Sequence, residues 1–160
     1  MVRHRALAEK LLASVRNERA QSSEAMCRFR EMVSEWRETP SSKPRRVLLV
    51  DDDETYRALL MDLLIGRFGC EVVAASAVDE ALAAGPIDSY HLIVTDLRLH
   101  GETAREFIAR LGPHHPHVLL ISAFHADEVE SIGADSFVSK TSPLDVIVAA
   151  LSRALAAGAA

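Results

Sequence analysis

The sequence has few cysteines and no long apolar run. The first feature argues against a disulfide-stabilised protein, and the second argues against a membrane-spanning one. Two cysteines, Cys27 and Cys70, cannot build a disulfide framework in 160 residues, so we expect a cytoplasmic protein. An apolar stretch at residues 6–15 is interrupted by Glu9 and Lys10, which argues against a signal peptide. No run approaches the length that spans a bilayer, and no internal repeat is present. We therefore expect a globular protein without membrane insertion.

The charge is distributed unevenly along the chain. Residues 1–46 carry 11 Lys/Arg against 6 Asp/Glu, or +5, and residues 47–160 carry 7 against 17, or −10. The basic residues of the first part alternate with glutamates, so we expect no direct nucleic-acid contact. The change of sign coincides with a segment rich in proline and serine, which is typical of a linker. The sequence therefore predicts a helical extension, a linker and one globular domain, at residues 1–39, 40–45 and 46–157.

Four short apolar segments are each followed directly by a polar side chain. Such runs, rich in β-branched residues, are typical of strands buried on both faces of a parallel sheet. Ligands bind at the carboxyl ends of the strands in open sheets of this kind. Neighbouring strand ends would bring together carboxylates, a hydroxyl and an ammonium, which is the composition of a phosphate and metal pocket. The segments and their polar ends are Val47–Val50 before Asp51-Asp52-Asp53, His91–Thr95 before Asp96, Val118–Ile121 before Ser122, and Ser136–Ser139 before Lys140.

Strands and helices are expected to alternate throughout this domain. Alternation of this kind favours right-handed crossovers and a three-layer α/β architecture. Ser76 and Ser142 are expected to cap the helices that follow them. The predicted strands are 47–50, 70–75, 91–95, 117–121 and 135–139, and the predicted helices are 54–67, 77–84, 102–111, 126–132 and 143–157.

From Arg46 to about Ala157, the chain resembles the receiver domain of two-component response regulators. The resemblance rests on the acidic cluster after the first strand, the single Asp96 after the third, Ser122 with alanine after the fourth, and Lys140 after the fifth. It implies the flavodoxin-like fold, with a five-stranded parallel sheet of order 2-1-3-4-5.

The resemblance also implies a phosphoacceptor and a magnesium site. Asp96 is expected to accept a phosphoryl group from a histidine kinase or a histidine phosphotransfer protein. Asp52 and Asp96 are expected to bind Mg²⁺ directly and Asp51 through water, with the backbone carbonyl of Arg98 as a further ligand. The expected product is a phosphoprotein in a signalling relay rather than an enzyme with a separate substrate.

The remaining residues of the motif are expected to contact the phosphoryl group or to report its arrival. Lys140, the hydroxyl of Ser122 and the backbone N–H of Ala123 would contact the phosphoryl oxygens. Ser122 and Phe137 would form the switch of the family. No recognisable output domain is present, so we expect signalling through protein contacts alone.

One alternative is a phosphatase of the haloacid-dehalogenase type. Residues 51–55 fit its D-x-D-x-T signature, with Asp51 and Asp53 as the reacting pair. That family also needs an acidic pair after its lysine, and only Asp145 follows Lys140. This interpretation also leaves Asp96 without a role.

A second alternative is a receiver-like adaptor that works without phosphorylation. The family usually has proline after the lysine, whereas Lys140 is followed by Thr141. A cis bond before a residue other than proline costs about 3 kcal/mol, so we expect this bond to be trans. The loop at residues 97–101 also lacks the proline that is common in the family.

The extension shows an apolar heptad pattern of Met26, Phe29, Val33 and Trp36. Polar residues at 21–23 favour a break between two short helices, and short helices need a partner surface. We favour self-association through these four residues into a homodimer. The alternative is that they pack on their own globular domain.

Overall fold

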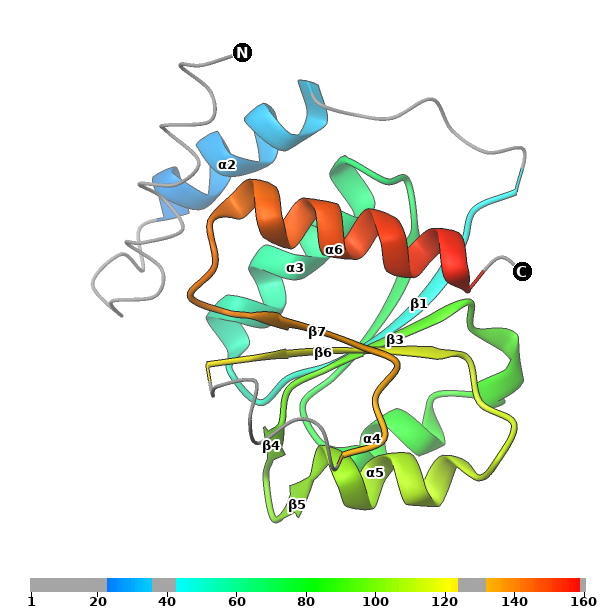
Figure 1. Ribbon diagram of the computed structural model, residues 1–160. Coiled ribbons are helices and arrows are strands. Elements are labelled where there is room, and N and C mark those ends of the chain that lie inside the picture. Colours follow the sequence, from blue (N-terminus) through cyan, green and yellow to red (C-terminus); the bar gives the residue numbers. More distant parts are fainter. Residues whose placement is uncertain (1–22, 36–42, 124–131, 159–160) are drawn as a thin grey trace.

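A five-stranded parallel sheet forms the centre of the protein (Figure 1). The computed structural model describes residues 23–35, 43–123 and 132–158. The strand order is β2-β1-β3-β6-β7, which confirms the predicted order 2-1-3-4-5. All neighbours in this sheet run parallel. The strands are β1 (Arg46–Val50), β2 (Glu71–Ala75), β3 (Leu92–Thr95), β6 (His117–Ser122) and β7 (Ser136–Ser139).

Helices cover both faces of the sheet, so the three-layer α/β architecture is confirmed. In Figure 1, α3 (Glu54–Gly66) and α6 (Leu144–Ala157) lie on one face, and α4 (Val78–Ala83) and α5 (Ala104–Leu111) lie on the other. A short 3-10 turn, Ile87–Ser89, precedes β3. The predicted helix at 126–132 falls almost wholly outside the described residues. Among the residues that the structure describes, no helix is long and apolar enough to cross a membrane.

The helix starts differ in part from the predicted caps. Ser76 does not cap α4, because its N–H and hydroxyl donate to Glu80 and the helix begins after Ala77 without a side-chain cap. Ser142 does not cap α6 either, because Pro143 occupies the N-cap position. A side chain cannot serve as the cap when it lies one residue too early, so both helices begin later than predicted.

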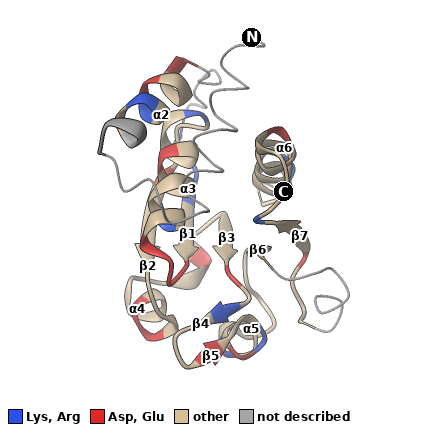
Figure 2. Cartoon of the chain, turned by 90° about the vertical axis from the view of Figure 1, so that its left-hand side faces the viewer, with Lys and Arg blue, Asp and Glu red and all other residues tan. Residues whose placement is uncertain are grey.

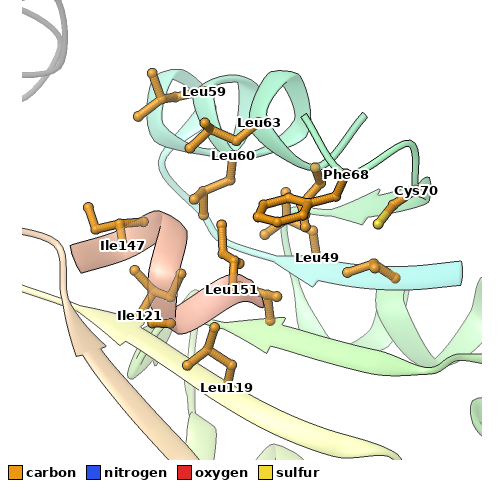
Figure 3. Close-up of a cluster of buried hydrophobic side chains, with 14 of the residues drawn as sticks. Leu49, Leu59, Leu60, Leu63, Phe68, Cys70, Leu119, Ile121, Ile147 and Leu151 are labelled. Carbon is orange, nitrogen blue, oxygen red and sulfur yellow. The ribbon is translucent and has the colours of Figure 1, made fainter. Parts of the chain in front are cut away.

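The core consists of two clusters, one on each face of the sheet. On the α3/α6 side, Leu60 and Leu63 of α3 face Leu151 of α6 above Leu49 and Leu119 of the sheet (Figure 3). On the α4/α5 side, the fully buried Phe107 of α5 belongs to the second cluster. Because both faces are covered, all of β3 and nearly all of β1 is buried, which explains their continuous apolar sequences.

Helix α2 (Ser23–Glu35) adds a further layer outside α3 (Figure 1). Phe29 and Val33 are 0% exposed, Met32 is nearly buried, and all three join the cluster of the α3/α6 side. A Cβ on Gly66 of α3 would lie 2.7 Å from Val33 Cγ1, so the glycine permits the close approach.

The expected dimer seam is therefore wrong for Phe29 and Val33. Both residues are buried against the same chain, which is the alternative that the heptad pattern left open. Packing within the same chain removes Phe29 and Val33 from water, just as packing against a second copy would. Trp36 and the side chain of Met26 lie outside the described part of the chain.

A short antiparallel hairpin follows β3 and was not predicted. Its strands are β4 (Arg98–Leu99) and β5 (Glu102–Thr103), and Gly101 turns between them with φ +77°. The N–H of Ala104 donates to the carbonyl of Leu97 at 2.8 Å, which closes the base of the hairpin. The loop after β3 is therefore held by backbone hydrogen bonds.

Candidate functional site

Two acidic residues leave the sheet side by side at its carboxyl edge. The ladder of β1 with β3 ends at the pair Val50 and Thr95, and the next residues are Asp51 and Asp96. The N–H of Asp96 donates to Val50 O at 3.0 Å, and that of Asp51 donates to Ala75 O at 3.2 Å. Figure 2 shows these acidic segments directly after the arrows of β1 and β3. Sheet hydrogen bonds thus fix the backbone at both carboxylates.

Lys140 reaches this pair from the end of β7. Its Nζ lies 2.7 Å from Asp51 Oδ2 and 2.6 Å from Asp96 Oδ2. The three side chains are 11%, 2% and 13% exposed, so the ion pairs are shielded from water. The backbone N–H of Lys140 donates to the backbone carbonyl of Ser122 at 2.8 Å. The Lys140–Thr141 peptide bond is trans, as predicted. The missing proline therefore does not turn the ammonium away from the carboxylates.

Tyr56 forms the opposite wall of the ammonium site and was missed by the sequence analysis. The Nζ of Lys140 lies 4.6 Å from the centroid of the Tyr56 ring, and the tyrosine is buried. Its N–H donates to Asp53 Oδ1, the N-cap of α3, at 3.0 Å. An aromatic residue in the first helical turn after the acidic cluster was the available signal.

The carboxylates of Asp51, Asp52 and Asp96 are close enough to share a metal ion. One oxygen of each lies within 4.8 Å of the others. A set of oxygen donors of this kind suits Mg²⁺, a hard cation. His100 Nδ1 lies 3.5 Å from Asp52 Oδ2, at the exposed side of the cluster. The three aspartates thus fit the divalent cation that the sequence predicts.

Backbone and guanidinium groups hold the acidic loop in place. Asp51 Oδ1 accepts from the N–H of Asp53 at 2.9 Å, and Asp96 Oδ1 accepts from the N–H of Leu97 at 2.6 Å. Arg57 Nη1 donates to the carbonyl oxygen of Asp51 at 2.6 Å. These bonds orient the carboxylates before any ligand arrives.

The electrostatics of the pocket favour positive charge. Burial raises the pKa of Asp51 to about 6, although Lys140 acts in the opposite direction. Burial also works to lower the pKa of Lys140, but the nearby charges of Asp51 and Asp96 overcome it and raise that pKa. The two shifts have different causes: desolvation disfavours the charged form of Asp51, whereas the neighbouring carboxylates favour the charged form of Lys140.

Ser122 and Ala123 lie at the same edge of the sheet, whereas Arg98 lies in the neighbouring hairpin and Phe137 lies earlier in β7, opposite Leu120. Ser122 ends β6 and is fully buried, and Ala123 follows it at the surface. Arg98 lies in β4, two residues beyond Asp96. Phe137 of β7 is half-buried and packs against the cluster of the α4/α5 side.

Asp53 differs from the other acidic residues of the cluster. Its side chain is exposed and accepts the hydrogen bond from the first turn of α3. Asp53 therefore caps α3. The phosphatase interpretation instead makes Asp53 one of the two reacting carboxylates, and the capping role gives that interpretation no support.

Comparisons with known proteins agree on one family and one fold. The response regulator receiver domain matches residues 47–152, which is 106 of 160 residues. The non-phosphorylated HemR receiver domain of Leptospira biflexa is 28% identical over 71% of this chain and 94% of that chain, with a TM-score of 0.59. A Burkholderia pseudomallei response regulator, solved with a phosphorylated aspartic acid, calcium and citrate, is 26% identical over 70% and 69%, with a TM-score of 0.58.

A third solved structure shows the fold alone. The BeF3-activated receiver domain of RstA from Klebsiella pneumoniae is 22% identical over 69% of this chain and 98% of that chain, with a TM-score of 0.60. No curated protein matches the sequence.

Proposed function

The chain belongs to the response regulator receiver domain family, and on this premise we propose that Asp96 accepts a phosphoryl group from a histidine kinase or phosphotransfer protein. Receiver domains work in two-component signalling and are generally signalling proteins rather than enzymes. The observation that carries the proposal is the contact of Lys140 Nζ with both Asp51 and Asp96. This contact places a cation beside the carboxylate that would react.

The proposed step is a displacement at phosphorus. An oxygen of Asp96 forms a bond to the phosphorus of a phosphohistidine while the P–N bond breaks. The electron pair of that bond stays on the imidazole nitrogen, which takes up a proton. The product is an acyl phosphate on Asp96 and a neutral histidine on the donor.

The Asp96 carboxylate and the phosphoryl group of the donor are both negatively charged and repel each other as they approach. Positive charge in the pocket would reduce this repulsion. Asp51, Asp52, Asp96 and the carbonyl of Arg98 would hold Mg²⁺, which supplies charge neutralisation and alignment of phosphoryl oxygens when bound. Lys140 would turn its ammonium to a phosphoryl oxygen, as a compact point charge can. The phosphorylated aspartic acid and calcium in the Burkholderia pseudomallei relative support this arrangement.

The signal would leave the pocket through Ser122 and Phe137. The hydroxyl of Ser122 and the N–H of Ala123 would donate to the phosphoryl group, and Phe137 would change its packing. Phe137 is half-buried and packs against the cluster of the α4/α5 side. The downstream partner would then be a protein that recognises this side of the molecule.

Intact-mass measurement after incubation with acetyl phosphate and Mg²⁺ tests the proposal. Wild type should gain the mass of one phosphoryl group, and Asp96→Asn should gain none, because an amide cannot form the acyl phosphate. Asp53→Asn is the matched control, because asparagine also caps a helix. An adduct that is unchanged in Asp96→Asn and lost in Asp51→Asn would favour the phosphatase interpretation instead.

The position of the Lys140 ammonium between Asp51 and Asp96 favours this function over a phosphorylation-independent adaptor. An adaptor has no need of a buried ammonium between two carboxylates, and burying charges is costly unless they are paired. If wild type gains no phosphoryl group under any Mg²⁺ concentration tested, the adaptor function replaces the proposal.

A further inference from the structure

We propose that Tyr56 is a positioning residue for Lys140, and that its ring face keeps the ammonium directed at Asp96 during phosphoryl transfer. This inference rests on the proposed function, because it assigns Tyr56 a task in the same reaction. Tyr56 would not touch the phosphoryl group itself. It would act through the lysine that does.

The ammonium of Lys140 contacts two carboxylates and lies over one aromatic ring. Two directions lead to Asp51 Oδ2 and Asp96 Oδ2, at 2.7 and 2.6 Å. The ring of Tyr56 lies on a further side, with its centroid 4.6 Å from Nζ. A cation within about 6 Å of a ring centroid is attracted by the negative face of the ring. The ammonium is thus held between two carboxylates and an aromatic face.

The ring is held by the backbone and by the core rather than by the lysine. The N–H of Tyr56 donates to Asp53 Oδ1 at 3.0 Å, which fixes the first turn of α3. Tyr56 is 3% exposed and belongs to the same buried cluster as Val138 and Ile147. The ring therefore stays in place when the charges around it change.

The ring differs from the carboxylates in what it can bind. Asp51 and Asp96 are also the groups proposed to hold a divalent cation and the phosphoryl group, so both contacts of Lys140 change during the reaction. Tyr56 carries no ligand oxygen on its ring face, so this contact persists. The lysine side chain is a flexible four-carbon stem, so without a fixed neighbour its ammonium would adopt several positions.

Thr141 makes this contact important in this chain. Proline at that position would restrict the backbone next to the lysine, and threonine does not. The backbone at Lys140 is held by its hydrogen bond to Ser122 O, but the side chain beyond it depends on its contacts. The ring of Tyr56 supplies the contact that does not depend on ligands.

Phosphorylation rates of three variants test the proposal in the full chain, with acetyl phosphate as donor. Tyr56→Leu should lower the rate by about tenfold, and Tyr56→Phe, which keeps the ring face, should restore most of it. Phe68→Leu is the matched control, because it removes another aromatic ring of the same cluster without touching Lys140. Equal rates for Tyr56→Leu and wild type, or an equal loss in Phe68→Leu, would overturn the proposal.

A background without the lysine separates positioning from packing. In Lys140→Ala, the further change Tyr56→Leu should leave the residual rate unchanged, because there is no ammonium left to position. A second tenfold loss in that background would show that Tyr56 acts on the fold or on the donor, and would contradict the proposal.

An NMR measurement tests the contact without any phosphoryl donor. The ε-methylene protons of Lys140 should resonate upfield in wild type because they lie near the face of the Tyr56 ring. Tyr56→Leu should remove this shift, Tyr56→Phe should keep it, and addition of Mg²⁺ should leave it in place. Loss of the shift on adding Mg²⁺ would overturn the inference. If wild type accepts no phosphoryl group, the proposed function fails while this measurement still decides the lysine contact.

Discussion

The two ends of helix α3 are in contact with very different surroundings. Its first turn closes the acidic pocket, where Asp53 caps the helix and the Tyr56 ring faces Lys140. Its last turns face α2, where Gly66 admits Val33 and the partly exposed Arg30–Asp62 ion pair lies beside the apolar contact. One end of the helix gathers buried charge and the other gathers apolar contact.

The two ends of α3 therefore serve different purposes, one in the chemistry of the pocket and the other in the stability of the fold. The buried polar residues Asp51, Thr95, Ser122 and Lys140 all lie at or next to strand ends near the pocket. Buried charge carries a desolvation cost, and proteins keep it where chemistry requires it. The contact with α2 contains groups that stabilise the fold by leaving water. Changes at the pocket should therefore alter function and cation dependence, and changes at α2 should alter stability alone.

The largest expected effect is the loss of a buried aromatic at the α2 contact. Phe29→Ala should lower the free energy of unfolding by about 3–5 kcal/mol, because Phe29 is fully buried in the core. Urea denaturation measures the loss, and the exposed Glu31→Ala on the same helix should change stability by less than about 0.5 kcal/mol. Phosphorylation at a temperature where the variant is folded should equal wild type. A variant as stable as wild type would mean that α2 does not contribute to the core.

Next in size is the response of the pocket to Mg²⁺. Clustered carboxylates repel one another, so a bound cation should stabilise the fold by about 2.7 kcal/mol at a hundredfold excess over its dissociation constant. Thermal melts with Mg²⁺ and with EDTA measure the difference. Asp52→Ala should abolish most of the increment, whereas Val33→Ala at the α2 contact should keep all of it. An equal increment in both variants would contradict the assignment of Asp52.

A smaller effect should appear in the pH dependence of the protein without metal. Burial raises the pKa of Asp51 from 3.8 to about 6. Between these two pH values the folded protein therefore keeps a proton on Asp51 that the unfolded chain has lost. The stability penalty of this group is complete above pH 6 and declines as the pH falls. Compared with Asp51→Asn in EDTA, wild type should gain about 1 kcal/mol between pH 7 and pH 5. Parallel stability curves for the two proteins would refute the shift.

An effect of similar size concerns the approach of α2 to α3. Gly66→Ala should destabilise the protein by about 1 kcal/mol, because the added Cβ would lie 2.7 Å from Val33 Cγ1. In a Val33→Ala background the same change should be neutral or stabilising, because alanine is a better helix former than glycine. Urea denaturation of the four proteins gives the coupling energy. Strict additivity would mean that the two residues do not touch.

Much of the pocket was predictable, because it follows from local patterns. Asp51, Asp96 and Lys140 each stand directly after a short strand, Ser122 ends one, and neighbouring parallel strands end at the same edge. Their convergence therefore needed only the strand order. The contact of Lys140 with both carboxylates depends on side-chain conformation, which no spacing in the sequence encodes.

The position of α2 was not predictable for a different reason. A stripe with Phe29 and Val33 buries equally well against a second copy or against the chain itself, so the pattern leaves the partner open. The information that decides it lies on the partner surface, where Gly66 leaves space for Val33. The missed caps at Ser76 and Ser142 have a simpler cause, since a cap requires a backbone geometry that residue type alone does not ensure.

The packing of α2 also bears on how this protein can be divided. The family match begins at residue 47, yet the hydrophobic core already includes Phe29. A fragment cut at the family boundary would lack α2, would expose the side of α3 around Gly66 to water, and would lose the buried surface of Phe29 and Val33. Such a fragment should have lower solubility and a greater tendency to associate than the intact chain. The hydrophobic core of this protein therefore extends beyond the residues that the family model matches.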